Sequence, residues 1–206
     1  PMSDDTGGRP ERLRTGDGVE LEAAWSGPTD PVAVAVLTHP HPRFGGDMHN
    51  IVPASLARSL PTAGVATVRF NFRGTGSSTG VHGDGRDEVA DVQAAVEAAA
   101  GAHPGVPIVA VGYSFGADVL LATADRRLAA VVAVAPPLAA LPVDELSRPR
   151  GDSPTLILSA AHDQFRDPAA AEAIVSSWPD TTFVVLEGAD HFMAGMSDHV
   201  RDRVLT

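Results

Sequence analysis

Cysteine is absent from this chain, so disulfide bonds and thiolate metal sites are excluded. Basic residues are scarce: 15 Lys and Arg stand against 26 Asp and Glu, which gives a formal net charge of −11. Duplex nucleic acid is bound through clustered Lys and Arg, and this charge balance therefore argues against a nucleic-acid partner.

Long hydrophobic runs are missing as well. No apolar stretch approaches the length of a membrane span, and the first residues lack the basic segment followed by an apolar segment that marks a signal peptide. We therefore expect a cytoplasmic protein with no membrane partner.

Apolar runs and helical periodicities alternate along the 206 residues. A hairpin is expected over residues 13–25, turning at Gly16-Asp17-Gly18. Further strands are expected at 32–38, 66–72, 107–111, 129–135, 154–159 and 182–186, and helices at 50–63, 87–100, 117–124, 168–178 and 195–205. The alternation predicts an α/β fold with a mostly parallel central sheet and helices on both faces. We expect one domain over residues 13–206, after a disordered segment 1–12.

One pentapeptide carries the strongest chemical signal. Gly112-Tyr113-Ser114-Phe115-Gly116 lies between an apolar run and a helix-like segment, the strand-turn-helix context in which a G-x-S-x-G match is meaningful. Small flanking residues allow a sharp, strained turn that exposes the serine hydroxyl. Ser114 is therefore the predicted nucleophile.

A serine needs a base and an orienting acid, and both follow at the ends of later predicted strands. Asp163 comes after the strand 154–159 and His191 after the strand 182–186. The carboxyl ends of parallel strands meet at one edge of a sheet, so these side chains are expected to converge on Ser114. Asp144 is the rival acid, whereas His162 and His199 are interpreted as structural or solvated.

Several further blocks give a family resemblance. They are His39-Pro40-His41-Pro42 with Gly45-Gly46-Asp47-Met48, the stretch Arg69 to Ser78, and Gly83-Asp84-Gly85 with Asp91. Together with the pentapeptide and the two strand-end loops, they resemble the α/β-hydrolase fold, in particular small lidless bacterial serine hydrolases and esterases related to dienelactone hydrolases. Relatives place Val-Pro shortly after the acid, where this chain has Gln164-Phe165-Arg166. The dienelactone branch uses a cysteine nucleophile, so the missing cysteine points to serine chemistry.

The predicted mechanism is acyl transfer through an acyl-enzyme, on carboxylic ester or thioester bonds. His191 acts as general base and Asp163 holds its tautomer. The oxyanion needs two N–H donors, one of which is expected from the backbone of Phe115. The second is expected from His41, with Arg43 as the alternative, because Pro40 and Pro42 have no N–H to give. Hydrogen bonds from Arg73 or Asn71 could support the site.

The short connection Leu138 to Ser153 leaves no room for a cap domain. We therefore expect an open site for a small-molecule ester, with a short acyl group or an exposed part of a larger substrate. Its predicted lining is Phe44, Tyr113, Leu138, Phe165 and Phe192, with Leu141 nearby.

No cofactor is expected, and a metal site at His39, His41 and His49 is disfavoured because no carboxylate-histidine signature accompanies these residues. An acyltransferase or perhydrolase that uses the same three residues is one alternative function. A noncatalytic binding module with this fold is another. The oligomeric state stays open, with a homodimer among the candidates.

Overall fold

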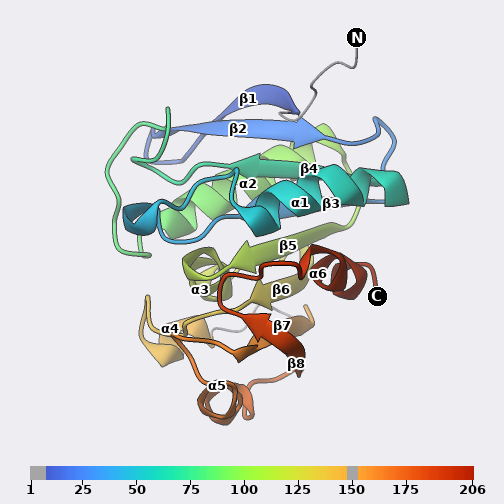
Figure 1. Cartoon of the computed structure of the whole chain (residues 1–206). Coiled ribbons are helices and arrows are strands. Elements are labelled where there is room, and N and C mark those ends of the chain that lie inside the picture. The colour runs from blue at the N-terminus through green and yellow to red at the C-terminus, as the bar shows by residue number, and fades with distance from the viewer. Residues whose placement is uncertain (1–7, 148–152) are drawn as a thin grey trace.

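The computed structural model describes residues 8–147 and 153–206. Its eight strands form a single sheet in the order β1-β2-β4-β3-β5-β6-β7-β8 (Figure 1). The strands are β1 (Arg9–Arg14), β2 (Glu20–Ser26), β3 (Ala33–Thr38), β4 (Val65–Phe70), β5 (Ile108–Tyr113), β6 (Leu128–Val134), β7 (Thr155–His162) and β8 (Thr181–Asp190). The pairs β1–β2 and β2–β4 are antiparallel, and every pair from β4 through β3 and β5 to β8 is parallel. The predicted mostly parallel α/β sheet is confirmed.

Helices cover both faces of the sheet. They are α1 (Ile51–Ser59), α2 (Glu88–Ala102), α3 (Phe115–Ala122), α4 (Val143–Leu146), α5 (Pro168–Val175) and α6 (Ser197–Val204), with 3-10 turns η1 (Pro42–Phe44) and η2 (Leu60–Ala63). Alternate residues of β3 face opposite sides: Val34 and Val36 pack in the cluster that contains residues of α2 to α5, and Ala35 and Leu37 pack in the cluster with α1 and α6. A strand buried on both faces reads as a continuous apolar run, which is why β3 could be predicted from its sequence.

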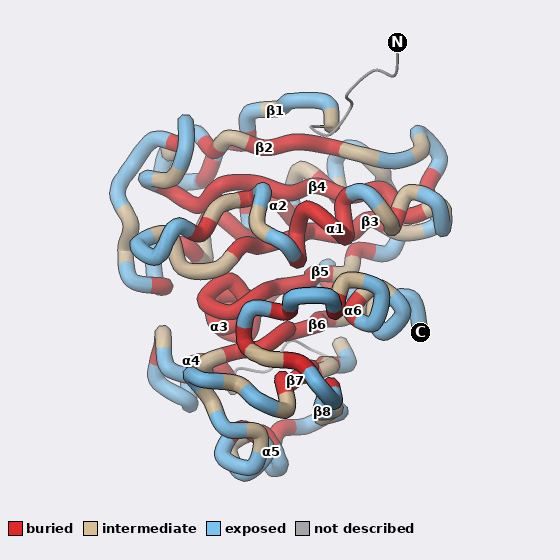
Figure 2. Tube along the Cα trace, in the orientation of Figure 1, coloured by how far each residue is buried: buried red, intermediate tan, exposed pale blue. Residues whose placement is uncertain are grey.

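Burial is concentrated in the middle of the sheet, as Figure 2 shows. All six residues of β4 are buried, whereas in β8 at the sheet edge only Leu186 and Ala189 are buried. The loops that follow the parallel strands emerge together at one edge, where three of them carry the predicted catalytic residues. Within the described residues, no helix has the length and apolar composition needed to cross a bilayer.

Most boundaries differ from the prediction by a few residues, and three of the differences affect the fold or the site. Strand β1 begins at Arg9, so residues 9–12 are ordered in the sheet and the expected disorder of this segment is wrong; residues 1–7 lie outside the described residues. The helix expected over 50–63 becomes α1 followed by η2, in which Pro61 cannot donate an α-helical hydrogen bond. Strand β8 continues to Asp190, directly before His191.

Candidate active site

Ser114 occupies the sharp turn between β5 and α3. Its backbone has φ 54° and ψ −122°, a conformation that non-glycine residues adopt only under strain. The neighbouring chain leaves no space for larger residues on either side: a Cβ at Gly112 would lie 2.6 Å from Ala117 Cα, and one at Gly116 would lie 2.5 Å from the His39 carbonyl oxygen. The two glycines therefore permit the close packing that holds Ser114 in this conformation.

His191 follows β8 and points its ring at the serine. Its Nε2 lies 2.9 Å from Ser114 Oγ. Two further hydrogen bonds fix its backbone, since the Tyr113 hydroxyl donates to the His191 carbonyl at 2.8 Å and the His191 N–H donates to Gln164 Oε1 at 3.1 Å. Burial and the nearby charges of Asp190 and Asp163 raise the pKa of Tyr113 to about 12, so its hydroxyl remains a donor. Gln164 thus supports the backbone of His191.

Asp163 follows β7 and lies on the other side of the imidazole. Its two carboxylate oxygens are 3.0 and 2.9 Å from His191 Nδ1. The same carboxylate accepts the backbone N–H groups of Phe165 and Arg166, at 2.8 and 3.0 Å. Burial alone would raise the pKa of Asp163, but the hydrogen bonds from His191 and the two amides hold it below its ordinary value. The carboxylate is thus ionised and positioned to keep a proton on Nδ1, leaving Nε2 free to accept one.

The rival residues lie elsewhere. Asp144 is exposed on α4, and it is Asp163 that approaches the imidazole. His162 and His199 are both exposed, the first at the end of β7 and the second on α6. Among the residues described, no three His, Asp or Glu side chains form a group that could hold a metal ion.

A cavity of about 820 Å³ opens in front of Ser114 and His191. Four of the five predicted lining residues do line it, namely Phe44, Tyr113, Phe165 and Phe192. The prediction for Leu138 is wrong, because this side chain is only 3% exposed and packs in the core. Its backbone has φ 51°, a left-handed conformation that turns the side chain inward and leaves Pro137, Ala139 and Ala140 at the wall. Leu141 is likewise buried and does not line the cavity.

Other lining residues were missed by the sequence prediction: Pro40, Gly46, Asn50, Ile51 and Asp84. The block Gly45-Gly46-Asp47-Met48 did signal that this loop mattered, but no periodicity fixes which of its residues face the cavity. Asp84 adds a carboxylate to a mostly apolar wall, and its Oδ1 lies 3.2 Å from Arg43 Nη1.

Two backbone N–H groups beside Ser114 are available as donors. Phe115 is the first residue of α3, where a helix offers its N–H no intrahelical acceptor. The N–H of His41 also has no acceptor within the described part of the chain. By contrast, the N–H of Arg43 donates to His41 Nδ1 at 3.2 Å. This geometry favours His41 over Arg43 as the second oxyanion donor.

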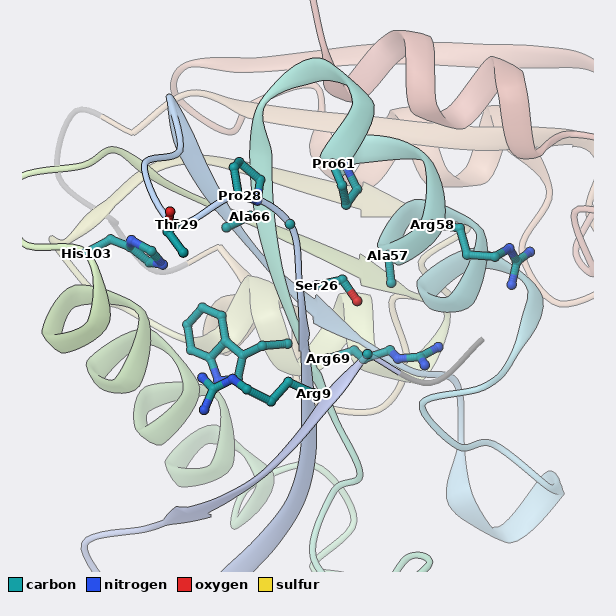
Figure 3. A pocket seen from close by; sticks show the side chains of 13 residues that line it. Arg9, Ser26, Pro28, Thr29, Ala57, Arg58, Pro61, Ala66, Arg69 and His103 are labelled. Atoms are coloured by element: carbon teal, nitrogen blue, oxygen red, sulfur yellow. The ribbon is translucent and has the colours of Figure 1, made fainter. Parts of the chain in front are cut away.

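A second hollow, of about 590 Å³, lies at the β2–β4 side of the sheet (Figure 3). Arg9, Arg58, Arg69 and His103 line it, and it shares no lining residue with the cavity at Ser114. Ser26 and His103 both line this hollow, but within the described residues no hydrogen bond joins their side chains and no carboxylate lines it.

The family model described as serine aminopeptidase, S33, matches residues 31–149. This range holds the loop with His41 and the turn with Ser114, and it ends before Asp163 and His191.

Solved structures resemble the whole chain. An α/β serine hydrolase homologue from Coxiella burnetii is 30% identical with a TM-score of 0.85, over 100% of this chain and 97% of its own. A serine hydrolase without a lid from Xanthomonas campestris is 27% identical with a TM-score of 0.84, over 99% of this chain and 94% of its own. These similarities confirm the α/β-hydrolase fold without a cap domain.

A curated protein with a named activity matches part of the chain. A monoacylglycerol lipase from Mycolicibacterium smegmatis is 32% identical over 105 residues, which are 50% of this chain and 36% of the lipase. The chain thus matches only about a third of that enzyme's length.

Proposed function

The chain belongs to the serine aminopeptidase, S33, family of α/β-hydrolases, and from this premise we propose that it cleaves carboxylic ester or thioester bonds through an acyl-enzyme on Ser114. One observation carries the proposal: an unbroken hydrogen-bonded series from Ser114 Oγ through His191 to Asp163 faces an open cavity. A serine hydroxyl is a weak nucleophile at neutral pH, and this arrangement is what activates it.

In the proposed reaction Ser114 Oγ attacks the substrate carbonyl while His191 Nε2 takes the hydroxyl proton. Negative charge then develops on the carbonyl oxygen, and the N–H groups of Phe115 and His41 stabilise it. His191 returns the proton to the leaving alcohol or thiol, and Asp163 stabilises the imidazolium in between. Water attacks the acyl-enzyme by the same route and restores the serine.

The cavity wall supports small or exposed acyl groups as substrates. Phe44, Phe165 and Phe192 are 85, 61 and 56% exposed, so they present apolar surface at the rim of an uncapped site. The Phe165 ring lies 4.4 Å from the His191 ring, which leaves an apolar contact next to the reacting atoms. Apolar walls with a few directed polar groups are typical of sites for small organic ligands.

Labelling with a fluorophosphonate probe tests the nucleophile, and Ser114→Ala is expected to abolish the labelling. The type of bond cleaved is then tested with p-nitrophenyl esters of increasing acyl length, thioesters and aminoacyl p-nitroanilides. We expect ester or thioester turnover that falls for long acyl chains. Turnover of the anilides alone would make the protein a peptidase, and labelling that persists in Ser114→Ala would end the proposal.

A further inference from the structure

We propose that His39 is a positioning residue that orients the Pro40–His41 peptide so that the His41 N–H faces the oxyanion. This inference rests on the proposed function and adds a residue to its machinery. His39 does not line the cavity, and its side chain is fully buried behind the loop that follows β3.

Both ring nitrogens of His39 are occupied by backbone groups. Nδ1 lies 2.7 Å from the Pro40 carbonyl oxygen, and Nε2 lies 3.0 Å from the Phe72 nitrogen. The Phe72 N–H can only donate, so Nε2 accepts, and the ring proton must sit on Nδ1 and donate to Pro40. Burial lowers the pKa of His39 to about 4, although the bond to Pro40 opposes this, so the ring stays in this neutral tautomer near neutral pH.

The acceptor of the Nδ1 proton belongs to the same peptide unit as the proposed oxyanion donor. No peptide bond in the described residues is cis, so the Pro40 C=O and the His41 N–H point in opposite directions across one plane. A hydrogen bond that holds the carbonyl toward His39 therefore directs the N–H away from it. Pro40 and His41 both line the cavity, together with Ser114 and Phe115.

Other contacts hold the neighbouring His41–Pro42 peptide and the Pro40 oxygen. The N–H groups of Phe44 and Gly46 both donate to the His41 carbonyl at 3.0 Å. Gly46 packs so closely that a Cβ there would lie 2.0 Å from the Pro40 oxygen. The His39 carbonyl in turn lies against Gly116, where a Cβ would be 2.5 Å away. His39 thus contacts both the peptide that carries the His41 N–H and the turn that carries the Phe115 N–H.

Two substitutions separate positioning from plain structural support. In His39→Asn the amide nitrogen can replace Nδ1 and donate to Pro40, but the shorter side chain cannot reach Phe72. In His39→Gln the amide oxygen can replace Nε2 and accept from Phe72, while the bond to Pro40 is lost. The first variant keeps the contact that orients the peptide, and the second keeps the contact that joins the two loops.

The experiment compares kcat and KM for p-nitrophenyl acetate, and inhibition by a trifluoromethyl ketone that forms a hemiketal oxyanion on Ser114. We expect His39→Gln to lower kcat, and to raise the inhibition constant of the ketone, by about 10²- to 10³-fold, which is the loss typical of one oxyanion donor. KM should change less than about threefold. His39→Asn should recover at least about tenfold of that loss. Equal losses in both variants, or an unchanged kcat in His39→Gln, would overturn the role.

NMR of the unsubstituted protein tests the same inference without depending on whether a variant folds. In NMR spectra of the ¹⁵N-labelled protein, His39 should carry its proton on Nδ1, and the His41 and Phe115 amide protons should move downfield when the ketone binds. A stationary His41 signal would refute the inference while leaving the nucleophile intact. Absence of both turnover and fluorophosphonate labelling in the unsubstituted protein would instead refute the proposed function.

Discussion

At the scale of single residues, the site depends on strain that the neighbouring packing holds in place. A non-glycine residue in the conformation of Ser114 costs on the order of 1–3 kcal/mol, and it persists only where the surroundings fix it. Here the Ser114 N–H donates to Val134 at 2.9 Å, and the Gly112 and Gly116 backbones are packed against α3 and the His39 loop. Favourable packing elsewhere therefore offsets the strain that exposes the Ser114 hydroxyl to the cavity.

Asp163→Asn tests the tautomer argument. The Asn oxygen can still accept the amides of Phe165 and Arg166, so the amide nitrogen would face His191 Nδ1. That nitrogen can only donate, which forces the ring proton onto Nε2 and removes the base from Ser114. We expect kcat for p-nitrophenyl acetate to fall about 10³- to 10⁴-fold.

Asp190→Asn is the matched control for that substitution. Asp190 directly precedes His191, and its carboxylate accepts the Phe192 N–H at 3.0 Å. An Asn oxygen can keep this bond, so kcat should change less than about threefold. A comparable loss of kcat in both variants would mean that the negative charge near the site matters and the tautomer does not.

Gly46→Ala tests the close packing on the Pro40–His41 peptide. The new Cβ would meet the Pro40 oxygen at 2.0 Å, so the loop must move and carry the His41 N–H with it. We expect kcat to fall by at least about 10²-fold, because one oxyanion donor is displaced.

Gly101→Ala is its control, since a Cβ at Gly101 of α2 meets nothing within 4 Å. This change should leave kcat unaltered and add up to about 1 kcal/mol of stability, because alanine favours a helix. Normal kcat in Gly46→Ala would show that the loop absorbs the clash without moving the donor.

At the scale of elements, the sequence could predict the strands and the three catalytic residues because both follow local rules. Strands buried on both faces leave continuous apolar runs, and the carboxyl ends of parallel strands share one edge. Ser114, Asp163 and His191 each directly follow a parallel strand, so position along the chain was enough to predict where they lie.

Leu138 shows where sequence prediction fails. After β6 the chain passes through Ala135 at φ 46° and Leu138 at φ 51°. Both have left-handed backbone conformations although neither is a glycine. Local rules place such conformations at Gly or Asn, so the reversal that buries Leu138 could not be predicted. The loop is instead determined by a long-range contact with α3.

That contact centres on Asp118, a fully buried residue of α3. Its carboxylate accepts the N–H groups of Leu138, Ala139 and Ala140 at 3.0, 2.8 and 2.9 Å. Burial raises the pKa of Asp118, and these three bonds oppose the effect. One side chain thus anchors the loop that forms part of the cavity wall.

Asp118→Asn should loosen this wall. The Asn nitrogen cannot accept from a backbone N–H, so at least one buried amide loses its partner, at a cost of about 2–3 kcal/mol. For a chain of this size the thermal midpoint should fall by about 5–10 °C, and KM for p-nitrophenyl acetate should rise as the wall shifts. Differential scanning calorimetry and steady-state kinetics measure the two effects.

Asp125→Asn separates the cavity effect from plain destabilisation. Asp125 follows α3 and forms an ion pair with Arg127, whose Nη2 lies 2.6 Å from Asp125 Oδ2. Neither residue lines the cavity at Ser114. Asp125→Asn should therefore lower the thermal midpoint while leaving KM unaltered. An equal rise of KM in both variants would show that Asp118 affects the site only through global stability.

At the scale of the whole molecule, the buried Arg73 connects the antiparallel edge to the parallel body. Arg73, in the loop after β4, donates to Asp91 of α2 at 2.9 and 2.7 Å and to Asp17 of the β1–β2 turn at 2.9 Å. Burial opposes its charge, but these carboxylates hold the pKa of Arg73 above its ordinary value. Arg73 thus joins the β1–β2 turn to α2. It does not line the cavity at Ser114, so the hydrogen bonds expected from it do not reach the site.

The buried His39 also couples the stability of the whole fold to pH. The unfolded chain takes up a proton on this ring near pH 6.5, whereas burial lowers the pKa in the folded state to about 4. Between these values the unfolded state binds one more proton, so His39 makes the folded protein less stable as the pH falls from 6.5 toward 4. The shift of about 2.5 pH units corresponds to about 3 kcal/mol, since one unit is about 1.4 kcal/mol.

Urea unfolding of the native protein and of His39→Gln at pH 8 and pH 4.5 measures this linkage. Glutamine binds no proton, so the variant should lose less stability than the native protein over this interval, by up to about 3 kcal/mol. All other titrating groups are common to both proteins and cancel in the comparison. His49→Gln, at an exposed position, should follow the native curve. If His39→Gln also followed it, the folded protein would have to accept the proton at His39 without cost, and the neutral tautomer that orients the Pro40–His41 peptide would lose its physical basis.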